Sequence, residues 1–445
     1  MAPLRPISEL ATIIERNTRV IEDGLKGSPA ENLSLAFGAP PQIELSHSLE
    51  ATRGEILEAL DELRARLMGP LGHLMLLVLP TSGIVGIFST LYKFDIASHV
   101  PLSPGAEISY KDLAKACGLP EDETRRIVQG AIAFRVFEEV IPDVSIRHNA
   151  ISSALTVPQL KDMLGLFVDE QLSGATKLAE SLRRFAGSGE PGHSACVLAY
   201  REAKAIKGSG VNEEIADPTK NFFDYIAEDE KRVARFRSAM GMSTKSLAFR
   251  SSYFVDALPW ADKSQCPETV VDIGGAGGDL CHLVDRKVLR THPHVKKAIV
   301  LDLPEVVADV KVPDDLENRL EFASYNFLTE TVTHQADAYI FRHIFHDWSD
   351  KYGAKILKNL VPALKKGSKL WFCEVVLPPL SETEHTKDQL KRVADIFMMA
   401  GFNGKERSKG GWEALLAAAD ERLRIVNITR PEGAHDAVIE VVFDA

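Results

Sequence analysis

Hydrophobic residues recur every three or four positions from Ile7 to Leu25, with charged residues between them. This spacing predicts an amphipathic helix with one face packed on a partner surface. The segment Gly27–Pro41 is rich in Gly, Ser, Ala and Pro and is typical of a linker. A second amphipathic pattern, from about Leu49 to Leu67, carries Glu, Asp and Arg on its outer face. The beginning of the chain is therefore expected to form two helices joined by a linker.

The most apolar stretch of the chain is Leu71–Leu91. His73, Pro80 and three glycines interrupt it, so the uninterrupted apolar length falls short of the roughly 20 residues that a membrane-spanning helix needs. We expect buried helices here, at an interface between subunits.

The segment Ile108–Leu155 predicts a winged helix. Ser109 can cap a short helix that ends near Gly118, and Glu121–Phe134 has the pattern of a second helix. The apolar residues that begin at Val140 lead toward a β-ribbon.

A winged helix could bind DNA through its second helix, where Arg125 and Arg126 lie. Three acidic residues, Glu121, Asp122 and Glu123, begin the same helix and would face the phosphates. The formal net charge of the chain is -11, which also argues against a general binder of nucleic acid or anionic membranes. We therefore expect no nucleic-acid or membrane partner.

The cysteines and the N-terminus bear on the cellular location. The five cysteines are an odd number, lie far apart and include no C-x-x-C pair, which is typical of reduced intracellular thiols and not of a disulfide framework or zinc site. The first residues lack the apolar core of a signal peptide. A cytoplasmic protein is expected. The cysteines are Cys117, Cys196, Cys266, Cys281 and Cys373.

From Thr269 onward, buried strands alternate with helices. Thr269–Ile273 is expected to be a strand that passes through glycines into a helix around Leu280–Leu289. Glycines let the backbone approach a ligand closely, and a helix N-terminus favours an anionic group. The next strand ends at Asp302, which is suited to accept hydrogen bonds from both ribose hydroxyls. The turn and the acid together indicate a nucleoside cofactor.

The spacing of the glycines narrows the choice of cofactor. A dinucleotide-binding turn needs G-x-G-x-x-G, and here Leu280 occupies the place of the third glycine. Asp272 stands two residues before Gly274, and Ala276 and Gly278 follow. This spacing resembles the D-x-G-x-G-x-G loop of S-adenosylmethionine-dependent methyltransferases, with alanine at the middle glycine.

The stretch Ala338–Asp350 begins as an apolar strand and ends abruptly in polar residues, among them His346 and Asp347. Ligands of open α/β sheets bind outside the carboxyl ends of the strands, so a histidine that emerges there is a candidate base. A structural role, in which Asp347 caps a helix beside a packed His346 and Trp348, explains the same residues.

Five motifs together resemble plant and fungal small-molecule O-methyltransferases of the caffeic-acid type. V-D-I-G-G-A-G-G, L-D-L-P-E-V-V, R-H-I-F-H-D-W-S-D, C-E-V-V-L-P and G-K-E-R occur in that family's order. The match runs from about Phe236 to the end, and the winged helix is similar to the family's dimerisation domain. The resemblance implies an α/β fold and a homodimer. The implied parts are a helical arm and linker (1–48), a winged-helix dimerisation domain (49–158), and a helical connector with a Rossmann-like S-adenosylmethionine methyltransferase domain (159–445).

The resemblance also implies roles for single residues. His346 matches the general base that removes the proton of the acceptor hydroxyl, and Glu374 and Glu406 match two acids that flank its imidazole. Asn326 stands where the family usually has aspartate on the adenine side, and Phe327 where an apolar side chain covers the adenine. The implied cofactor-binding residues are Asp272, Gly274, Gly275, Asp302, Leu303, Asn326, Phe327 and Arg342. The implied acceptor-binding residues are Phe236, Met240, Phe397 and Met398, although Phe236 and Met240 have a spacing that is also typical of core packing.

The expected activity is transfer of a methyl group from S-adenosylmethionine to a phenolic or enolic hydroxyl of a small molecule, as part of secondary metabolism. Such transfer needs in-line alignment and a base, and no metal is expected. Asp347 and Asp350 are expected to be structural or capping residues. The alternative is a relative that binds S-adenosylmethionine without transferring its methyl and instead promotes dehydration or pericyclic cyclisation. The presence of His346 with both glutamates favours transfer.

Overall fold

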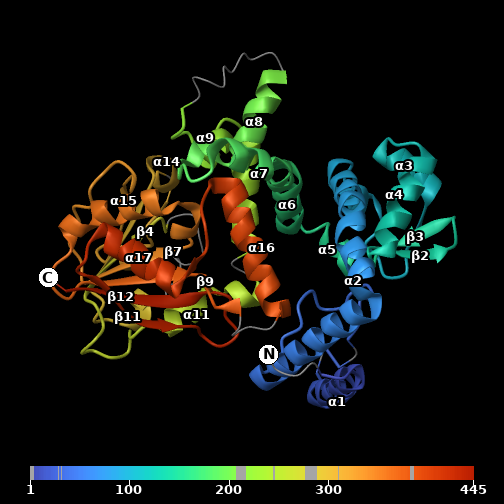
Figure 1. The fold of residues 1–445 in the computed structure, drawn as a ribbon, viewed down its shortest axis with the longest axis horizontal. Coiled ribbons are helices and arrows are strands. Elements are labelled where there is room, and N and C mark those ends of the chain that lie inside the picture. Colours follow the sequence, from blue (N-terminus) through green and yellow to red (C-terminus); the bar gives the residue numbers. More distant parts are fainter. Residues whose placement is uncertain are drawn as a thin grey trace. The chain divides into compact units, whose positions relative to one another are not determined.

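The computed structural model describes residues 5–28, 30–31, 33–206, 217–243, 246–275, 288–308, 310–380 and 385–444. The chain divides into two compact units (Figure 1). The first unit comprises residues 1–169 with 384–387, and the second comprises residues 170–383 with 388–445.

The first unit begins with two helices that pack against each other, α1 (Ile7–Leu25) and α2 (His47–Lys93). α1 buries one apolar face, which includes Leu10 and Ile21, and exposes its charged face. The predicted first helix is therefore confirmed. The second helix begins as predicted but extends well beyond the expected end at Leu67.

The segment Leu71–Leu91, expected to form buried helices at a subunit interface, is part of one helix that is largely exposed in the single chain, and its burial at an interface stays a prediction. α2 has one non-helical residue, Gly69 (φ 67°), and continues through Pro80 without a break. Leu71 and Leu77 are 70% and 60% exposed. Apolar residues surround this part of the helix on most sides, so a single neighbouring helix cannot cover them.

Within the described residues, α2 is the one helix that is long and apolar enough to cross a membrane, on the criteria of length and composition. Only 6% of its apolar window is buried. A helix that packs against a second protein surface meets the same criteria, so this finding by itself assigns no membrane location.

The rest of the first unit confirms the predicted winged helix. Ser109 caps α3 by accepting a hydrogen bond from the Asp112 backbone N–H at 3.0 Å, and Gly118 ends that helix with a φ of 70°. The three strands form an antiparallel sheet in the order β1-β3-β2. The elements are β1 (Ile108–Ser109), α3 (Tyr110–Cys117), α4 (Glu121–Ala133), β2 (Glu138–Ile141), β3 (Ser145–Arg147), α5 (Ala150–Ala154) and α6 (Pro158–Leu166).

The two arginines of α4 are paired within their own helix. Arg125 forms an ion pair with Glu121, and Arg126 lies 3.8 Å from Asp122. These carboxylates neutralise the positive charge that a DNA-binding helix would present to phosphates.

The second unit is built on a seven-stranded sheet in the order β11-β12-β8-β7-β4-β5-β6. β12 pairs antiparallel with its neighbours, whereas the pairs from β8 to β6 are parallel. The first strand of this sheet along the chain, β4, lies in its middle. The chain adds β5 and β6 on one side of β4 and then adds β7 on the other side. Ligands of such sheets bind beside this reversal of strand order, between β4 and β7. The strands are β4 (Thr269–Ile273), β5 (Lys297–Asp302), β6 (Leu320–Ser324), β7 (Ala338–Arg342), β8 (Lys369–Glu374), β11 (Leu423–Thr429) and β12 (Ala437–Phe443).

Helices cover both faces of this sheet (Figure 1). Alternate residues of β7 point to opposite faces, so Tyr339 and Phe341 join the core under α15 and α17, whereas Ile340 packs on the side of α11. The α-helices that begin in the described part of this unit, together with α16, which begins at His385, are α7 (Leu172–Phe185), α8 (Ala195–Ile206), α9 (Phe222–Ile226), α10 (Glu230–Ser243), α11 (Ser251–Asp256), α13 (Leu289–Thr291), α14 (Pro304–Val307), α15 (Asp350–Leu360), α16 (His385–Phe402) and α17 (Lys409–Ala419). A two-stranded parallel ladder joins β9 (Val376–Leu377) and β10 (Arg407–Ser408).

The carboxyl ends of the parallel strands carry a glycine or a charged residue. β4 runs into Gly274, β5 ends at Asp302, β7 at Arg342 and β8 at Glu374. Because these strands are parallel and adjacent, the four positions meet at one edge of the sheet. The Rossmann-like α/β architecture expected for this part of the chain is thereby confirmed.

Two expectations fall partly outside the described residues. The helix predicted around Leu280–Leu289 lies there up to residue 287, together with Ala276, Gly278 and Cys281. The other four cysteines are free thiols, as expected.

Candidate active site

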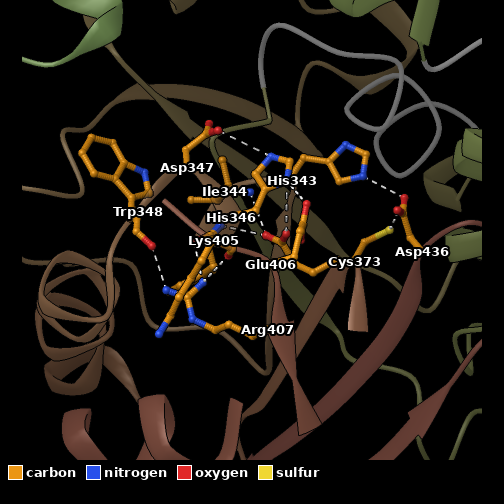
Figure 2. Close-up of polar contacts among 12 residues, drawn as sticks. His343, Ile344, His346, Asp347, Trp348, Cys373, Lys405, Glu406, Arg407 and Asp436 are labelled. Atoms are coloured by element: carbon orange, nitrogen blue, oxygen red, sulfur yellow. Dashed lines mark hydrogen bonds and ion pairs between the residues drawn. The ribbon is translucent and has the colours of Figure 1, made fainter. Parts of the chain in front are cut away.

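The end of β7 carries the candidate base to the sheet edge. The strand ends at Arg342, and a short 3-10 helix, Phe345–Asp347, places the His346 side chain there with 18% exposure. His346 Nδ1 lies 3.1 Å from Glu406 Oε1 (Figure 2). The backbone oxygen of His346 accepts a hydrogen bond from the Lys405 N–H at 2.9 Å. The loop after β7 and the G-K-E-R segment are thus joined through backbone and side chain.

Glu374 lies at the end of β8 and is 1% exposed. Its Oε1 accepts hydrogen bonds from the backbone N–H groups of Ile344 and Phe345, each at 2.8 Å, and its Oε2 lies 4.0 Å from His346 Nδ1. The two acids expected to flank the imidazole therefore differ in their contacts. Glu406 bonds the ring, whereas Glu374 fixes the backbone that carries it.

Burial and charge act in opposite directions on the imidazole. Burial alone would lower the pKa of His346, but three surrounding carboxylates raise this pKa well above its ordinary value. These carboxylates are Asp347, Glu374 and Glu406. Burial raises the pKa of Asp347 to about 6 and the pKa of Glu374 to about 7. The site therefore stabilises a protonated imidazole, the form that a general base produces.

Asp347 was expected to be a structural or capping residue, and it does not cap α15. The N-cap of α15 is Ser349, and Asp347 Oδ1 instead lies 3.6 Å from His346 Nε2. Asp350 has the expected structural role, because its Oδ1 accepts a hydrogen bond from Arg407 Nε at 3.0 Å.

Arg407 holds the loop on both sides of the candidate base. Its side chain is 1% exposed. Nη1 donates to the Phe345 carbonyl at 2.6 Å, and Nη2 donates to the Trp348 carbonyl at 2.7 Å. These two carbonyls bracket His346 in the sequence, so the rigid guanidinium fixes the loop that positions the imidazole.

The same cluster could hold a metal ion. One ligand atom from each of His346, Glu374 and Glu406 lies within 4.8 Å of the other two. Glu406 already contacts the imidazole, and Glu374 already accepts two backbone hydrogen bonds. The second carboxylate oxygen of Glu374, Oε2, is buried without a hydrogen-bond partner among the described residues, so the absence of a metal stays an expectation.

The turn after β4 leaves room only for glycine. Gly274 has a φ of 77°, and a Cβ there would lie 2.5 Å from the Ile344 side chain. A Cβ on Gly275 would lie 2.4 Å from the carboxylate of Asp272. Since real Cβ atoms do not approach other atoms this closely, a side chain at either position would force its neighbour to move, and Gly274 also needs glycine for its backbone conformation.

The other predicted cofactor residues follow β5 and β6. Asp302 Oδ1 accepts a hydrogen bond from the Leu303 backbone N–H at 2.7 Å, and Leu303 is 36% exposed. Asn326 Oδ1 accepts from the Leu328 N–H at 2.9 Å. Phe327 packs edge-on against Trp348, with ring centroids 5.9 Å apart. These side chains follow the carboxyl ends of β5 and β6 and so lie along the same edge of the sheet as the glycine turn.

Arg342, predicted to border the cofactor, also holds a neighbouring segment. Its Nη2 donates a hydrogen bond to the Phe249 carbonyl at 2.7 Å. Phe249 ends a short 3-10 helix, Leu247–Phe249, that precedes α11.

The predicted acceptor residues lie on α10 and α16. Phe236 packs against Phe222 and Phe223, with centroid distances of 6.2 and 5.7 Å, so it belongs to an aromatic cluster. At the end of α16, the Met398 carbonyl accepts from the Gly404 N–H at 3.1 Å. A Cβ on Gly404 would lie 2.1 Å from the His346 backbone oxygen, which brings the end of α16 against the loop of the candidate base.

The structure adds residues that the sequence interpretation missed. Arg407 stands beside Glu406 in G-K-E-R, so its motif was visible but its role was not. His343 was visible as a polar residue at a strand end, and its partner Asp436 lies 93 positions away, at a Nε2 to Oδ2 distance of 2.7 Å. No local pattern in the sequence indicates that contact.

Comparison with known proteins identifies the family of this chain. Residues 211–420 match the O-methyltransferase domain family. O-methyltransferase AMT9 of Alternaria alternata is 31% identical over 450 residues, which cover 98% of this chain and 98% of the relative.

Two solved structures share the fold. OxaC in complex with SAH and oxaline has a TM-score of 0.72 at 19% identity, covering 98% of this chain and 99% of OxaC. LepI in complex with SAM has a TM-score of 0.68 at 20% identity, covering 98% of this chain and 100% of LepI. At these identities the likeness concerns the fold alone.

The elevated pKa of Glu374 makes a testable prediction about stability. The folded-state pKa, about 7, lies above the ordinary value of 4.5, so the stability contributed by this group is present below pH 4.5 and is lost as the pH rises through 7. Glu374→Gln keeps the acceptor oxygen and removes the charge. We expect its melting temperature to exceed that of the wild type by about 5 °C at pH 8 and to match it near pH 5.

Differential scanning calorimetry at both pH values measures this difference. Glu305→Gln, which changes an exposed carboxyl on α14, serves as the matched control. An equal shift at both pH values would contradict the prediction.

Proposed function

Because this chain belongs to the family of S-adenosylmethionine-dependent O-methyltransferases, we propose that His346 removes the proton from a phenolic or enolic hydroxyl as that oxygen accepts the methyl group. One observation carries the proposal: the imidazole stands at the carboxyl edge of the sheet with Nδ1 against Glu406 Oε1 at 3.1 Å. With Nδ1 occupied in this way, Nε2 is the atom that would take the acceptor's proton.

The electrostatics suit this proton transfer. A phenol has an ordinary pKa near 10, by analogy with tyrosine, and proton transfer improves as the pKa of the base approaches that of the acid. The surrounding carboxylates raise the pKa of His346 toward that range. S-adenosylmethionine supplies the electrophilic methyl group when bound.

The glycine turn supports the proposed cofactor site. A side chain at Gly275 would fill the space against the Asp272 carboxylate. We assign to Asp302, at the end of the adjacent strand, the role of accepting hydrogen bonds from the ribose hydroxyls. We assign the remaining cofactor contacts to Leu303, Asn326, Phe327 and Arg342, and the flanking acids of the base to Glu374 and Glu406.

The acceptor is proposed to be an aromatic or enolic secondary metabolite. Phe236 and Met240 on α10 and Phe397 and Met398 on α16 supply apolar, polarisable side chains suited to a flat ring. A relative that binds the cofactor but does not transfer its methyl would need no base paired to Glu406. The contact between His346 and Glu406 therefore favours transfer over dehydration or cyclisation.

We also propose the quaternary structure and location. The apolar surface of α2 is large for a single chain, and a second copy of the chain would cover it in a homodimer. The arm (1–48) and the winged helix (49–158) would then serve dimerisation, and the remainder (159–445) catalysis. The free thiols fit a cytoplasmic enzyme.

The first prediction from this proposed function separates cofactor binding from methyl transfer. His346→Gln is expected to bind S-adenosylmethionine as the wild type does but to lose at least about 100-fold in transfer rate, because the base is absent. Gly275→Ala is expected to lose cofactor affinity, because its Cβ collides with Asp272. Calorimetry measures binding, and mass spectrometry measures label transferred from methyl-labelled S-adenosylmethionine to an extract of the producing organism's metabolites.

Two outcomes would contradict the proposal. Wild-type protein that binds the cofactor, moves no label and converts a metabolite to an isomer or dehydrated product would be a non-transferring enzyme. Full transfer by His346→Gln would remove His346 from the role of base.

The second prediction concerns pH. The base must be unprotonated to act, so kcat/KM rises with pH through the pKa of His346. Burial lowers this pKa, and Glu406 is among the carboxylates that raise it. Glu406→Gln removes one of these charges, so its acid limb should lie at lower pH than that of the wild type.

Asp350→Asn is the matched control, because Asp350 pairs with Lys405 and Arg407. Its acid limb should coincide with that of the wild type. A limb that moves to higher pH in Glu406→Gln would contradict the assigned role of Glu406.

The third prediction concerns the dimer. Light scattering at micromolar concentration should give twice the chain mass of 48.9 kDa. Leu74→Glu with Val78→Glu places charges on a surface where these residues are 51% and 57% exposed, and it should reduce the mass to one chain. Val426→Glu, at a position 61% exposed on β11, should leave the dimer intact. A wild-type mass of one chain would exclude the proposed dimer.

A further inference from the structure

A second buried histidine–carboxylate pair lies beside the proposed base. His343 Nε2 is 2.7 Å from Asp436 Oδ2, and Asp436, which directly precedes β12, is 6% exposed (Figure 2). His435 Nδ1 lies 3.3 Å from the other carboxylate oxygen, and Cys373 Sγ lies 3.8 Å from Oδ2. Burial opposes ionisation of Asp436, but hydrogen bonds from His343 and His435 lower the pKa of this carboxyl, so it is charged.

The backbone of His343 has an unusual conformation. Its φ is 51°, in the left-handed region that residues other than glycine rarely adopt. Its N–H donates to the Cys373 carbonyl at 3.2 Å, and the next residue, Ile344, donates its N–H to Glu374. β8 therefore holds the backbone on this side, and Asp436 holds the ring.

The ring of His343 stacks on the ring of His346. The centroids are 5.4 Å apart and the planes differ by 23°. The Phe249 ring packs edge-on against the His343 ring, with the centroids 6.1 Å apart. The His343 ring thus lies on one face of the proposed base, His346, whose ring nitrogens face the carboxylates of Asp347, Glu374 and Glu406.

The charge of His343 decides whether its ring would repel a protonated His346. Burial lowers its pKa, the adjacent charges of Arg342 and His346 act in the same direction, and Asp436 opposes them without reversing the shift. A neutral ring can lie against the imidazolium that forms at His346 during proton transfer without repelling it.

We propose that His343 and Asp436 are positioning residues that fix the plane of the His346 imidazole, so that a carboxylate before the last strand controls the rate of proton removal. This inference rests on the proposed role of His346 as the base. Neither residue is assigned a contact with the cofactor or the acceptor. A loosened imidazole would lose its alignment with the acceptor oxygen, and such misalignment lowers the rate of the chemical step.

Two substitutions test the pair. His343→Asn removes the ring but suits a left-handed backbone, and Asp436→Asn removes the charge with little change of shape. Each should lower the label-transfer rate at saturating metabolite extract and saturating S-adenosylmethionine by about 10-fold. The dissociation constant of S-adenosylmethionine should stay within about twofold of the wild-type value, because the cofactor residues are unchanged.

A double-mutant cycle distinguishes positioning from general stabilisation. His343→Asn combined with Asp436→Asn should lose no more rate than either single variant, because the two residues act as one unit. His435→Asn is the matched control, since it contacts the other oxygen of the same carboxylate, and it should keep the wild-type rate. Losses that add in the double variant, or that arise from weaker cofactor binding, would overturn the proposal.

The His346→Gln background separates this inference from the proposed function. If His346 is the base and His343 acts through it, His343→Asn should not reduce the residual rate of His346→Gln further. Full activity of His346→Gln would refute the base assignment itself. A loss of activity in His346→Gln beside an unchanged rate in His343→Asn would refute only the positioning pair.

Discussion

The candidate site depends on how buried carboxyl groups are compensated beside one imidazole. Glu374 and Glu406 are 1% and 6% exposed, and an unpaired buried charge costs several kcal/mol. Glu406 is offset by contact with His346, and Glu374 by two backbone N–H groups of the loop that carries this histidine. The loop can keep these charges buried only in the conformation that places the imidazole at the sheet edge. Stabilising the loop and positioning the base are therefore the same set of contacts.

The parallel sheet determines which residues can take part. Its strands β4, β5, β7 and β8 end at one edge, so the glycine turn, the proposed ribose acid, the proposed base and its proposed supporting acid converge from four distant parts of the chain. Two further residues support this edge: Arg407, which lies in β10, and Asp436, which directly precedes β12. Arg407 fixes the carbonyls around His346, and Asp436 fixes the ring stacked on it. The proposed base, His346, is thus held through its backbone, one edge of its ring and one face of its ring.

In the first unit, one part buries its apolar residues and another part exposes them. Its winged helix buries an apolar core of its own, whereas α2 exposes a long apolar surface in the single chain. A large apolar surface exposed to water is unfavourable by roughly 25 cal/mol for each Å², which favours association with another surface. The acidic pairing of the α4 arginines makes nucleic acid a poor partner for this unit.

Local patterns in the sequence were sufficient for much of the molecule. α1, α3, α4 and the strands β4, β5 and β7 lie where periodicity and capping residues placed them, because hydrophobic spacing and end signals are local properties. The motif order also identified His346, Glu374 and Glu406 as neighbours in space. Tertiary structure decided what no local pattern could. Pro80 does not end α2, because a proline removes only one backbone hydrogen bond from a long helix. Asp347 faces His346 instead of capping α15, and His343 meets Asp436 across 93 positions, because contacts between side chains depend on which strands the sheet brings together.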